Sequence, residues 1–524
     1  FIFPHADEVM ISPESKWVTF NEGDNIYLVP MPFKGLFSSP IAIDKKDGKG
    51  ALPVKKLSDQ GGIHPSWLNE TTVQFGSGSQ YFTYNIESSN KETHDINLVI
   101  PRNIPQGTIV LSGARILTMD NRKVIDNGDI VINKGRISCL GECDKSNADK
   151  IVDLRGKTII PGLIDMHSHF YREYRGIIPM KTFEASVPLA YGVTSNLDNS
   201  MWSQDVFPAA EMIEAGVLIG SRTYSSGDPL YAGDGPRQNE LTSYKITEDN
   251  IKRLVSWGAV SLKQYMQPQR KQRQWVSDIA RKYGLMVTSE GSDLHYNLSM
   301  IMDGQTAWEH PISYMPMYSD AAKFFGKAKT VYSPTFMVGG SGPWNDEYFF
   351  AQSEVWKDKK LRLWIPWQQL IPHSRRRELR PETDYSYPFL AQVLADIMAE
   401  GGHGAIGSHG QQHGIASHWE VWVAASAMGP MGALELGTNE GAYFLGAQND
   451  VGSLAKGKLA DLIVLNSNPL DDIKNTLDIK YVMKGGILYD GFNLDEIWPE
   501  KKKYGERPWI NEDALRQDSR SINN

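Results

Sequence analysis

The sequence contains little cysteine: Cys139 and Cys143 are the only two among 524 residues. Their C-x-x-x-C spacing differs from the C-x-x-C of thioredoxin-like redox motifs and of zinc ribbons. A structural zinc site would need a second pair of ligands, which no other cysteine can supply. Two interpretations stay open: a pair of unreactive thiols, or a small local disulfide formed in an oxidising compartment.

Long apolar runs and excess positive charge are also missing. No apolar run approaches about 18 residues, so we expect no transmembrane helix. The net charge of −8 argues against nucleic acid or an anionic membrane as the main partner. The opening FIFPHADEVM lacks the basic and apolar regions of a signal peptide, which we therefore expect outside this sequence if one exists. The overall composition is typical of a globular protein, and the length predicts two or three domains.

The N-terminal part, residues 1–106, repeats one pattern. SPESKWVTF at Ser12–Phe20 and HPSWLNETTVQF at His64–Phe75 each place a polar turn before a strand that ends in Phe, and a second short strand follows each. A period of about fifty residues predicts β-propeller blades, and the wording resembles the last two blades of TolB-like propellers. Because a propeller needs at least about four blades to close, we expect the rest to come from the upstream part of the same precursor or from a partner chain.

The stretch Gly156–His169, GKTIIPGLIDMHSH, consists of two short apolar runs followed by His-x-His. Alternate residues of a strand point the same way, so His167 and His169 are expected to project together. Two imidazoles on one face make half of a metal site; the alternative is two unrelated strand histidines. The whole phrase PGLIDMHSH resembles the first barrel strand of the amidohydrolase superfamily, whose members are metal-dependent hydrolases.

Residues 161–449 alternate strand-like and helix-like runs, as a (β/α)₈ TIM-type barrel of the α/β class requires. The flanking segments 107–160 and 450–492 are short β-rich runs with Gly turns, and the resemblance implies that they form a small β-sandwich beside the barrel. Residues 493–524 are expected to be a C-terminal tail. An insertion from about 341 to 387 is expected to be a lid, a substrate wall or a surface contact. The eight candidate barrel strands are GLIDMH, GVTSNLD, VLIGSRTYSS, AVSLKQY, LMVTSE, TAWEH, TVYSPTF and GAIGSH.

Barrel active sites collect residues from the C-terminal ends of several strands. The fourth, fifth and sixth candidate strands supply Lys263, Glu290 and His310. In the family the lysine is carboxylated and bridges two metal ions, and DG-x-x-x-x-EH carries a metal-binding histidine. Glu290 departs from the usual histidine, but a carboxylate is also a sound metal ligand. Glu309 belongs to the same phrase as His310 and is expected to point the opposite way if the strand is regular.

The eighth candidate strand ends in His409, where family members usually have an aspartate that binds metal and takes a proton. A neutral imidazole can serve as ligand or as general base, but it does not supply negative charge. If His409 is a ligand, Glu290 or Glu309 must carry the proton. His413 is expected to be a polar loop residue, and the H-x-E of the following helix begins at His418.

The resemblance, closest to the imidazolonepropionase-like branch, implies a metal-dependent hydrolase of C–N bonds in amides, cyclic amides or dipeptides of small-molecule substrates. Dipeptidase (prolidase-like) or lactonase activity on the same site is an alternative, and a barrel that has lost catalysis and serves as a binding or assembly module is another. One or two divalent transition metals are implied, with Zn²⁺ as the default. We expect a periplasmic or secreted location and leave homo-oligomerisation open. The candidate substrate contacts are Arg222, which could instead form a structural ion pair, and Tyr231, Arg237 and Tyr265.

Overall fold

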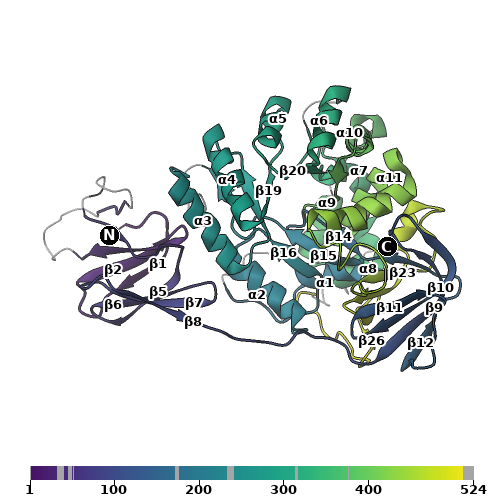
Figure 1. Cartoon of the computed structure of the whole chain (residues 1–524), viewed down its shortest axis with the longest axis horizontal. Helices are drawn as coiled ribbons and strands as arrows, with labels where there is room; N and C mark the ends of the chain where they lie inside the picture. Colours follow the sequence, from purple (N-terminus) through teal and green to yellow (C-terminus); the bar gives the residue numbers. More distant parts are fainter. Residues whose placement is uncertain are drawn as a thin grey trace. The chain divides into compact units, whose positions relative to one another are not determined.

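The computed structural model describes residues 2–31, 41–44, 50, 52–170, 176–232, 241–312, 317–340, 342–375 and 377–510. They form two compact units, and each is described by itself. The first unit comprises Phe1–Ile100, Trp202–Phe207 and Ser226–Ser289; the second comprises Pro101–Met201, Pro208–Ser225 and Glu290–Asn524. Figure 1 labels their helices and strands.

The first unit begins with two four-stranded antiparallel sheets, as the repeated pattern of residues 1–106 leads us to expect. The repeats are equivalent in detail, because Phe20 pairs with Tyr27 in one sheet and Phe75 with Phe82 in the other. Each pair stacks its rings at 5.3 Å. The strands are β1 (Ala6–Ile11), β2 (Trp17–Glu22), β3 (Asn25–Pro30) and β4 (Lys55–Lys56), then β5 (Ile63–Asn69), β6 (Thr72–Ser77), β7 (Gln80–Asn85) and β8 (Lys91–Asp95).

The rest of the first unit is a three-stranded parallel sheet with helices. Arg253 is buried on α3, where it pairs with Asp24 of the β2–β3 turn at 2.9 Å and with Asp228 at 2.6 Å. The side chain of Ser243 caps the start of α3, and Gly258 ends it in a left-handed conformation. The elements are β17 (Leu230–Tyr231), β18 (Ser261–Tyr265), β19 (Met286–Ser289), α3 (Tyr244–Trp257) and α4 (Arg270–Tyr283).

One nine-stranded sheet of the second unit unites two distant segments of the chain. Strand β13 pairs with β23 in antiparallel register, so that Thr158 faces Leu465. Residues of the ranges 107–160 and 450–492 therefore share a sheet, and its buried side chains form one apolar core. The strands are β9 (Thr108–Leu117), β10 (Val124–Asn133), β11 (Arg136–Gly141), β12 (Lys150–Asp153), β13 (Thr158–Pro161), β23 (Leu462–Leu465), β24 (Ile479–Lys484), β25 (Ile487–Asp490) and β26 (Glu496–Trp498).

Two further parallel sheets alternate with helices in the second unit, which gives a mixed α/β fold. All strands of these sheets except β16 and β22 are buried throughout, which explains their nearly continuous apolar sequences. They are β14 (Leu163–Asp165), β15 (Val193–Asp198) and β16 (Arg222–Ser225), then β20 (Ala307–Glu309), β21 (Val331–Ser333) and β22 (His403–Gly404). Each of the eight predicted strand segments overlaps a parallel strand of one unit or the other, although the eighth segment, GAIGSH, does so only at Gly404.

The helices of this part of the chain are mostly short, and the insertion after β21 contributes three of them. Phe349 of that insertion stacks on Trp419 of α11 (Ile415–Glu435), with 5.2 Å between the ring centroids. The C-terminal segment packs on it as well, since Trp509 donates to the carbonyl of Trp364 at 2.7 Å. The helices are α1 (Phe183–Ala190), α2 (Ser203–Glu214), α5 (Leu294–Met302), α6 (Ser319–Ala328), α7 (Asn345–Gln352), α8 (Lys359–Trp364), α9 (Trp367–Arg375), α10 (Tyr387–Ala399), α11 (Ile415–Glu435) and α12 (Gly441–Phe444).

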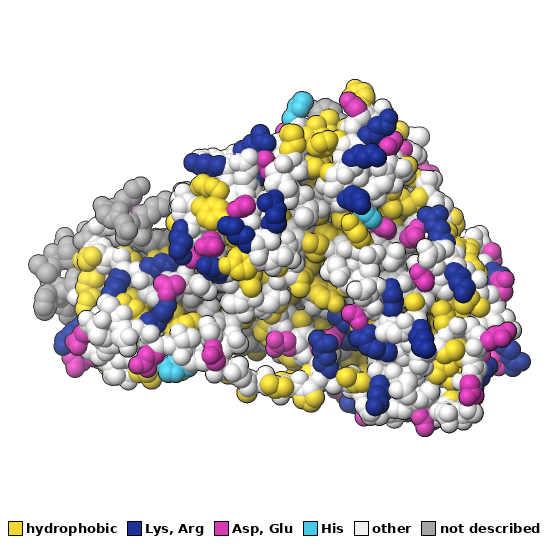
Figure 2. Space-filling view, in the orientation of Figure 1, with side chains coloured by type: hydrophobic (Ala, Val, Ile, Leu, Met, Phe, Trp, Pro, Cys, Tyr) yellow, Lys and Arg dark blue, Asp and Glu magenta, His cyan; other side chains and the backbone are white. Residues whose placement is uncertain are grey.

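Charges of both signs are interspersed over the face drawn in Figure 2. No helix among the described residues is long and apolar enough to cross a membrane. A disulfide joins Cys139 and Cys143 after β10, which decides between the two interpretations of that cysteine pair.

Candidate metal centre

The loop that follows β14 carries the His-x-His motif. Strand β14 ends at Asp165, so a bend of the chain, and not strand alternation, brings the two histidines together. His169 has a φ of +43°, and its Nε2 lies 2.8 Å from Nε2 of the fully buried His167. Asp165 secures the bend, since its carboxylate accepts from Ser417 Oγ at 2.8 Å and from the N–H of His167 at 3.2 Å. Burial raises the pKa of Asp165 above its ordinary value.

His310 directly follows β20 and has both ring nitrogens engaged. Its Nδ1 lies 2.8 Å from Thr335 Oγ1, and its Nε2 lies 3.0 Å from Glu290 Oε2. The Thr335 hydroxyl donates its proton to the carbonyl of Pro334 at 2.7 Å. The hydroxyl oxygen then accepts from His310 Nδ1–H, and the Nε2 atom faces the Glu290 carboxylate.

His409 lies in the loop between β22 and α11, and its backbone N–H donates to the carbonyl of His167 at 2.7 Å. Like His169 and His310, it takes a left-handed conformation, with φ values of +56° for His409 and +72° for His310. Such conformations are uncommon for residues other than glycine, and they persist where the surrounding structure imposes them, often at functional sites.

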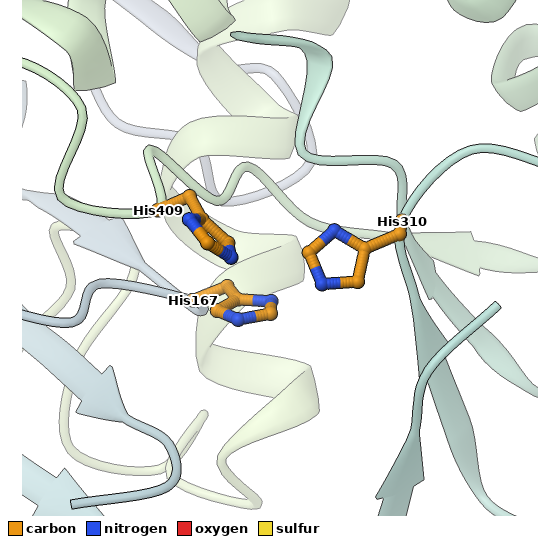
Figure 3. A group of neighbouring side chains, drawn as sticks. All are labelled: His167, His310 and His409. Atoms are coloured by element: carbon orange, nitrogen blue, oxygen red, sulfur yellow. The ribbon is translucent and has the colours of Figure 1, made fainter. Parts of the chain in front are cut away.

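The four imidazoles form one cluster. Nitrogen atoms of His167, His310 and His409 lie within 4.8 Å of one another, and Figure 3 shows the three rings around a common space. The ring centroid of His169 is 4.6 Å from that of His167 and 4.6 Å from that of His409. Imidazoles this close together cannot all be protonated without strong repulsion, so at least part of the cluster offers lone pairs.

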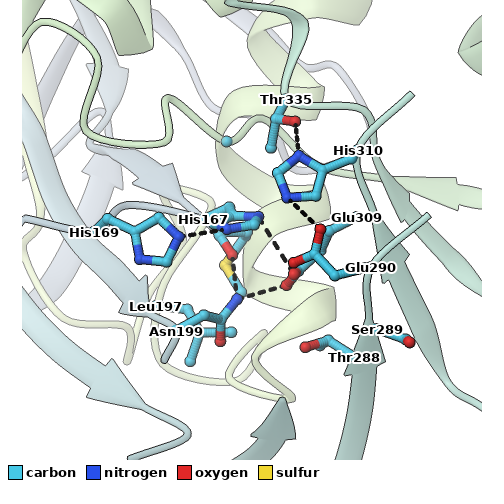
Figure 4. Close-up of polar contacts among 12 residues, drawn as sticks. His167, His169, Leu197, Asn199, Thr288, Ser289, Glu290, Glu309, His310 and Thr335 are labelled. Atoms are coloured by element: carbon cyan, nitrogen blue, oxygen red, sulfur yellow. Dashed lines mark hydrogen bonds and ion pairs between the residues drawn. The ribbon is translucent and has the colours of Figure 1, made fainter. Parts of the chain in front are cut away.

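Two carboxylates border the cluster (Figure 4). Glu309 is fully buried, with Oε2 at 3.4 Å from His167 Nδ1 and Oε1 accepting from Asn199 Nδ2 at 2.5 Å. The sequence led us to expect Glu309 and His310 to point in opposite directions. Because β20 ends at Glu309 and His310 is left-handed, the regular alternation stops there and both side chains contact members of the cluster.

The donor set fits a divalent transition metal. Imidazole nitrogens and carboxylate oxygens are the ligands that Zn²⁺ and its neighbours prefer. The Nε2 atom of His310 faces a carboxylate oxygen, and the Nε2 atoms of His167 and His169 lie 2.8 Å apart. Each of these contacts needs a shared proton or a cation between its two atoms. The outer contacts of Thr335 and Asn199 are of the kind that orient metal ligands.

Three other predicted site residues lie in the first unit. Lys263 is fully buried on β18, and its ammonium lies 5.0 Å from the centre of the Tyr265 ring. Tyr231, at the end of β17, has its ring 4.6 Å from that of Tyr265. Arg237 falls outside the described residues. Arg222, in the second unit, pairs with Asp461 and lies 3.3 Å from Glu214, which is the structural ion pair considered as its alternative role.

The loop and helix after β22 are tightly braced. The ring of His413 packs edge-on against Phe170 and Phe183. His418 Nε2 donates to the carbonyl of Tyr191 at 2.8 Å, and burial lowers the pKa of His418 to about 3. Burial raises the pKa of Glu420 to about 8, and this carboxyl accepts from the N–H of Met337 at 2.8 Å.

Sequence reasoning missed Asn199, Thr335 and Asp165. Asn199 lies just beyond β15 and contacts Glu309 across 110 positions of the chain. Thr335 lies just beyond β21 with a φ of +46°, which is rare for a β-branched residue. No motif marks either residue, but their positions directly after barrel-type strands would have been a usable signal.

Comparison with known proteins shows similarity to one family over part of the chain. Residues 392–488 match the Amidohydrolase family. The chain is 30% identical to 5'-deoxyadenosine deaminase of Methanosarcina acetivorans over 109 residues, 20% of this chain and 22% of that protein. It is 20% identical to 5'-deoxyadenosine deaminase of Methanobrevibacter smithii over 414 residues, 74% of this chain and 90% of that protein.

A solved structure of a Xaa-Pro dipeptidase with bound methionine shares the fold, with a TM-score of 0.57 and 21% identity over 73% of this chain and all of that one. The chain thus spans only about a fifth of the M. acetivorans deaminase, but most of the M. smithii deaminase and of the dipeptidase. Residues 392–488 of the protein are therefore similar to the Amidohydrolase family, and its fold resembles that of the Xaa-Pro dipeptidase.

Proposed function

We propose that the protein is a metal-dependent hydrolase that cleaves the C–N bond of a small amide, cyclic amide or dipeptide. The observation that carries the proposal is the convergence of four imidazoles with two carboxylates at the ends of parallel strands. A divalent metal, Zn²⁺ by default, supplies Lewis-acid activation of the substrate carbonyl.

The residues divide into ligands and a proton carrier. His167, His169, His310, His409 and Glu290 hold the metal, and a carboxylated Lys263 completes a second position. His409 is assigned as a ligand because its ring nitrogen faces those of His167 and His310.

Glu309 is the group that takes a proton from the attacking water and returns it to the leaving amine. The buried Asn199 donates to one oxygen of Glu309 and thereby holds the carboxylate in a fixed orientation, as a general acid–base residue requires.

The finer architecture is part of the same proposal. The alternating strands and helices of residues 161–449 form a (β/α)₈ barrel, and the nine-stranded sheet is the flanking β-sandwich of an imidazolonepropionase-like amidohydrolase. The two N-terminal sheets are blades of a TolB-like propeller, completed by upstream sequence of the same precursor. The Cys139–Cys143 disulfide supports a periplasmic or secreted location, since such bonds persist in oxidising compartments.

A second candidate function is hydrolytic deamination of an aminopurine-type substrate. It is favoured by the matches to 5'-deoxyadenosine deaminases, one of which extends over 74% of this chain. Deamination also breaks a C–N bond by attack of water, so the same ligands and the same proton carrier serve it.

The experiment is metal analysis combined with a substrate panel. Protein purified without chelator is assayed for transition metals and for turnover of dipeptides, N-acyl amino acids, cyclic amides, lactones and 5'-deoxyadenosine. We expect one to two metals per chain and turnover of at least one C–N substrate, abolished in His310→Asn. Protein without metal that does not respond to added Zn²⁺ would contradict the proposal and favour a barrel that only binds or assembles. Turnover of lactones alone would favour a lactonase.

A further inference from the structure

A cavity of about 770 Å³ lies in the insertion that follows β21, outside the histidine cluster. Its lining includes Trp344, Asp346 and Phe350 of the α7 region, Arg377 and Arg380 beyond α9, and Gln411 of the loop after β22. This volume is in the range of pockets that hold small molecules. No residue of the proposed catalytic machinery lines the cavity, so its role must be a different one.

Residues near the cavity are connected to two segments that carry the cluster, the loop after β22 and the segment after β21. Gln411 lies two positions after His409. On the other side, Asn345 at the start of α7 donates to the carbonyl of Phe336 at 2.8 Å, directly after Thr335, the partner of His310. The loop after β22 thus carries His409 first and the cavity residue Gln411 shortly after it. The segment after β21 carries Thr335 first and then leads to the α7 residues that line the cavity. The cavity thus adjoins, along the chain, the two loops that carry the cluster.

The charged groups of the wall indicate which ligand the cavity accepts. Arg380 is paired with Glu378. Arg377 donates to the carbonyl of Ser353 at 3.2 Å, and its guanidinium lies over Trp356 at 4.3 Å. The charge of Arg380 is thus balanced by Glu378, whereas these two contacts of Arg377 are with neutral groups.

Asp346 is different. Its residue is 4% exposed although it lines the cavity, and among the described residues no cation pairs with it. Burial, together with the charge of the neighbouring Glu347, raises the pKa of Asp346 to about 7. A buried carboxyl without a cation is costly to ionise, and a positively charged ligand would remove that cost.

Trp344 supplies the complementary surface. It precedes α7, is 52% exposed and lines the same cavity as Asp346. An indole face attracts cations, and tryptophan is the aromatic residue that does so best. Phe350 adds a buried apolar wall that suits the alkyl chain carrying such a cation.

We propose that this cavity is a substrate subsite for a cationic group, an ammonium or a guanidinium on an aliphatic chain, with Asp346 as its counter-ion and Trp344 as its aromatic wall. This inference rests on the proposed hydrolase function, and it names the substrate class: amides or dipeptides with a basic side chain. Glu347, exposed at the rim, steers the cation electrostatically.

The test compares two substrates that differ only in charge, Ala-Lys and Ala-norleucine, on the full-length metal-loaded chain. The kcat/KM ratio of the lysine to the norleucine dipeptide is expected to be at least about 10, the gain typical of a charged hydrogen bond. Asp346→Asn should bring this ratio close to 1. Glu347→Gln, at an exposed position that tolerates substitution, should lower it by about two- to fivefold. The matched control Glu354→Gln, an exposed acid in the same insertion but outside the cavity, should leave it unchanged.

A direct binding measurement separates this inference from the proposed function. Titration with benzylammonium, followed by calorimetry and tryptophan fluorescence, is compared with the neutral benzyl alcohol. If neither dipeptide is cleaved, the dipeptide form of the proposed function fails, yet benzylammonium binding that is weakened about tenfold or more in Asp346→Asn still supports a cation subsite. A kcat/KM ratio near 1 in the wild type, or equal binding of the two benzyl compounds, overturns the inference while hydrolysis itself stands.

Discussion

Thr335 Oγ1 lies 2.8 Å from His310 Nδ1, and the same hydroxyl donates to the carbonyl of Pro334. With the proton on Nδ1, this pair of bonds directs Nε2 of His310 toward the proposed metal. The histidine is thus oriented by a residue that no motif in the sequence marks.

The first prediction follows from that contact. Thr335→Val removes the acceptor for Nδ1–H while keeping the branched shape, so metal affinity should fall by about 10- to 100-fold, the usual cost of losing such an outer contact. Competition with a chelator measures the affinity. Thr335→Ser keeps the hydroxyl and should retain most of it; equal affinities for the Val and Ser variants would contradict the assigned tautomer.

The second prediction concerns His409. As a metal ligand, His409→Asp should keep metal and activity, because a carboxylate is also a ligand and adds the missing negative charge. His409→Asn should lose metal together with activity. If His409 were instead the general base, the Asn variant would keep its metal and lose about 10²–10⁴ in turnover. Metal content and kcat measured on the same samples distinguish the two roles, and full activity of the Asn variant would show that His409 has neither.

The third prediction concerns stability against pH. The folded pKa of Glu420 is raised from 4.5 to about 8 by burial, so its contribution to stability is complete below pH 4.5 and is lost as the pH rises through about 8. The difference amounts to at most about 5 kcal/mol. Glu420→Gln mimics the neutral acid and should flatten the decline in unfolding temperature between pH 5 and 8.5. The exposed Glu500→Gln serves as control; parallel pH profiles for wild type and Glu420→Gln would refute the argument.

The fourth prediction tests the first unit. Arg253→Met should destabilise it by about 3–5 kcal/mol, because Asp24 and Asp228 would lose the guanidinium that they share in a largely buried setting. Adding Asp24→Asn and Asp228→Asn to Arg253→Met should recover much of the loss. Thermal unfolding and limited proteolysis of the N-terminal sheets report the change. No rescue in the triple variant would mean that packing of the arginine stem, and not charge, is what matters.

A fifth prediction concerns the two N-terminal sheets. Edge strand β1 exposes Val9, Met10 and Ile11 by 41%, 41% and 57%, an apolar edge that proteins normally cover. If upstream blades complete a propeller, mass spectrometry of native material should find a longer chain or an associated fragment. A monodisperse chain of residues 1–524 with a protease-resistant N-terminus would contradict this.

Much of the fold could be predicted because short strand-like segments such as GLIDMH recur between turn residues and helix-like segments. The eighth segment, GAIGSH, is made of small residues that carry little strand preference, and regular pairing stops at Gly404. Similarly, the candidate ligands were recognisable by their positions after such strand-like segments.

The supporting contacts were not predictable, because they join distant positions. The bond of Asn199 to Glu309 spans 110 residues, and the side-chain direction of Glu309 depends on where β20 ends. Local sequence patterns predict neither the Asn199–Glu309 contact nor the direction of the Glu309 side chain. Whether Arg222 contacts substrate or forms a structural ion pair likewise could not be decided from the sequence, because its partner Asp461 is 239 residues away.

The left-handed backbone at position 409, with a φ of +56°, restricts what evolution can place there. Glycine, asparagine, aspartate and histidine adopt this conformation most readily, whereas β-branched residues strongly resist it. Two of those four residues, aspartate and histidine, are common metal ligands. A drift between histidine and aspartate at this position therefore needs no movement of the main chain, so related chains can exchange one ligand for the other in a single substitution and tune the charge of the centre without rebuilding the loop.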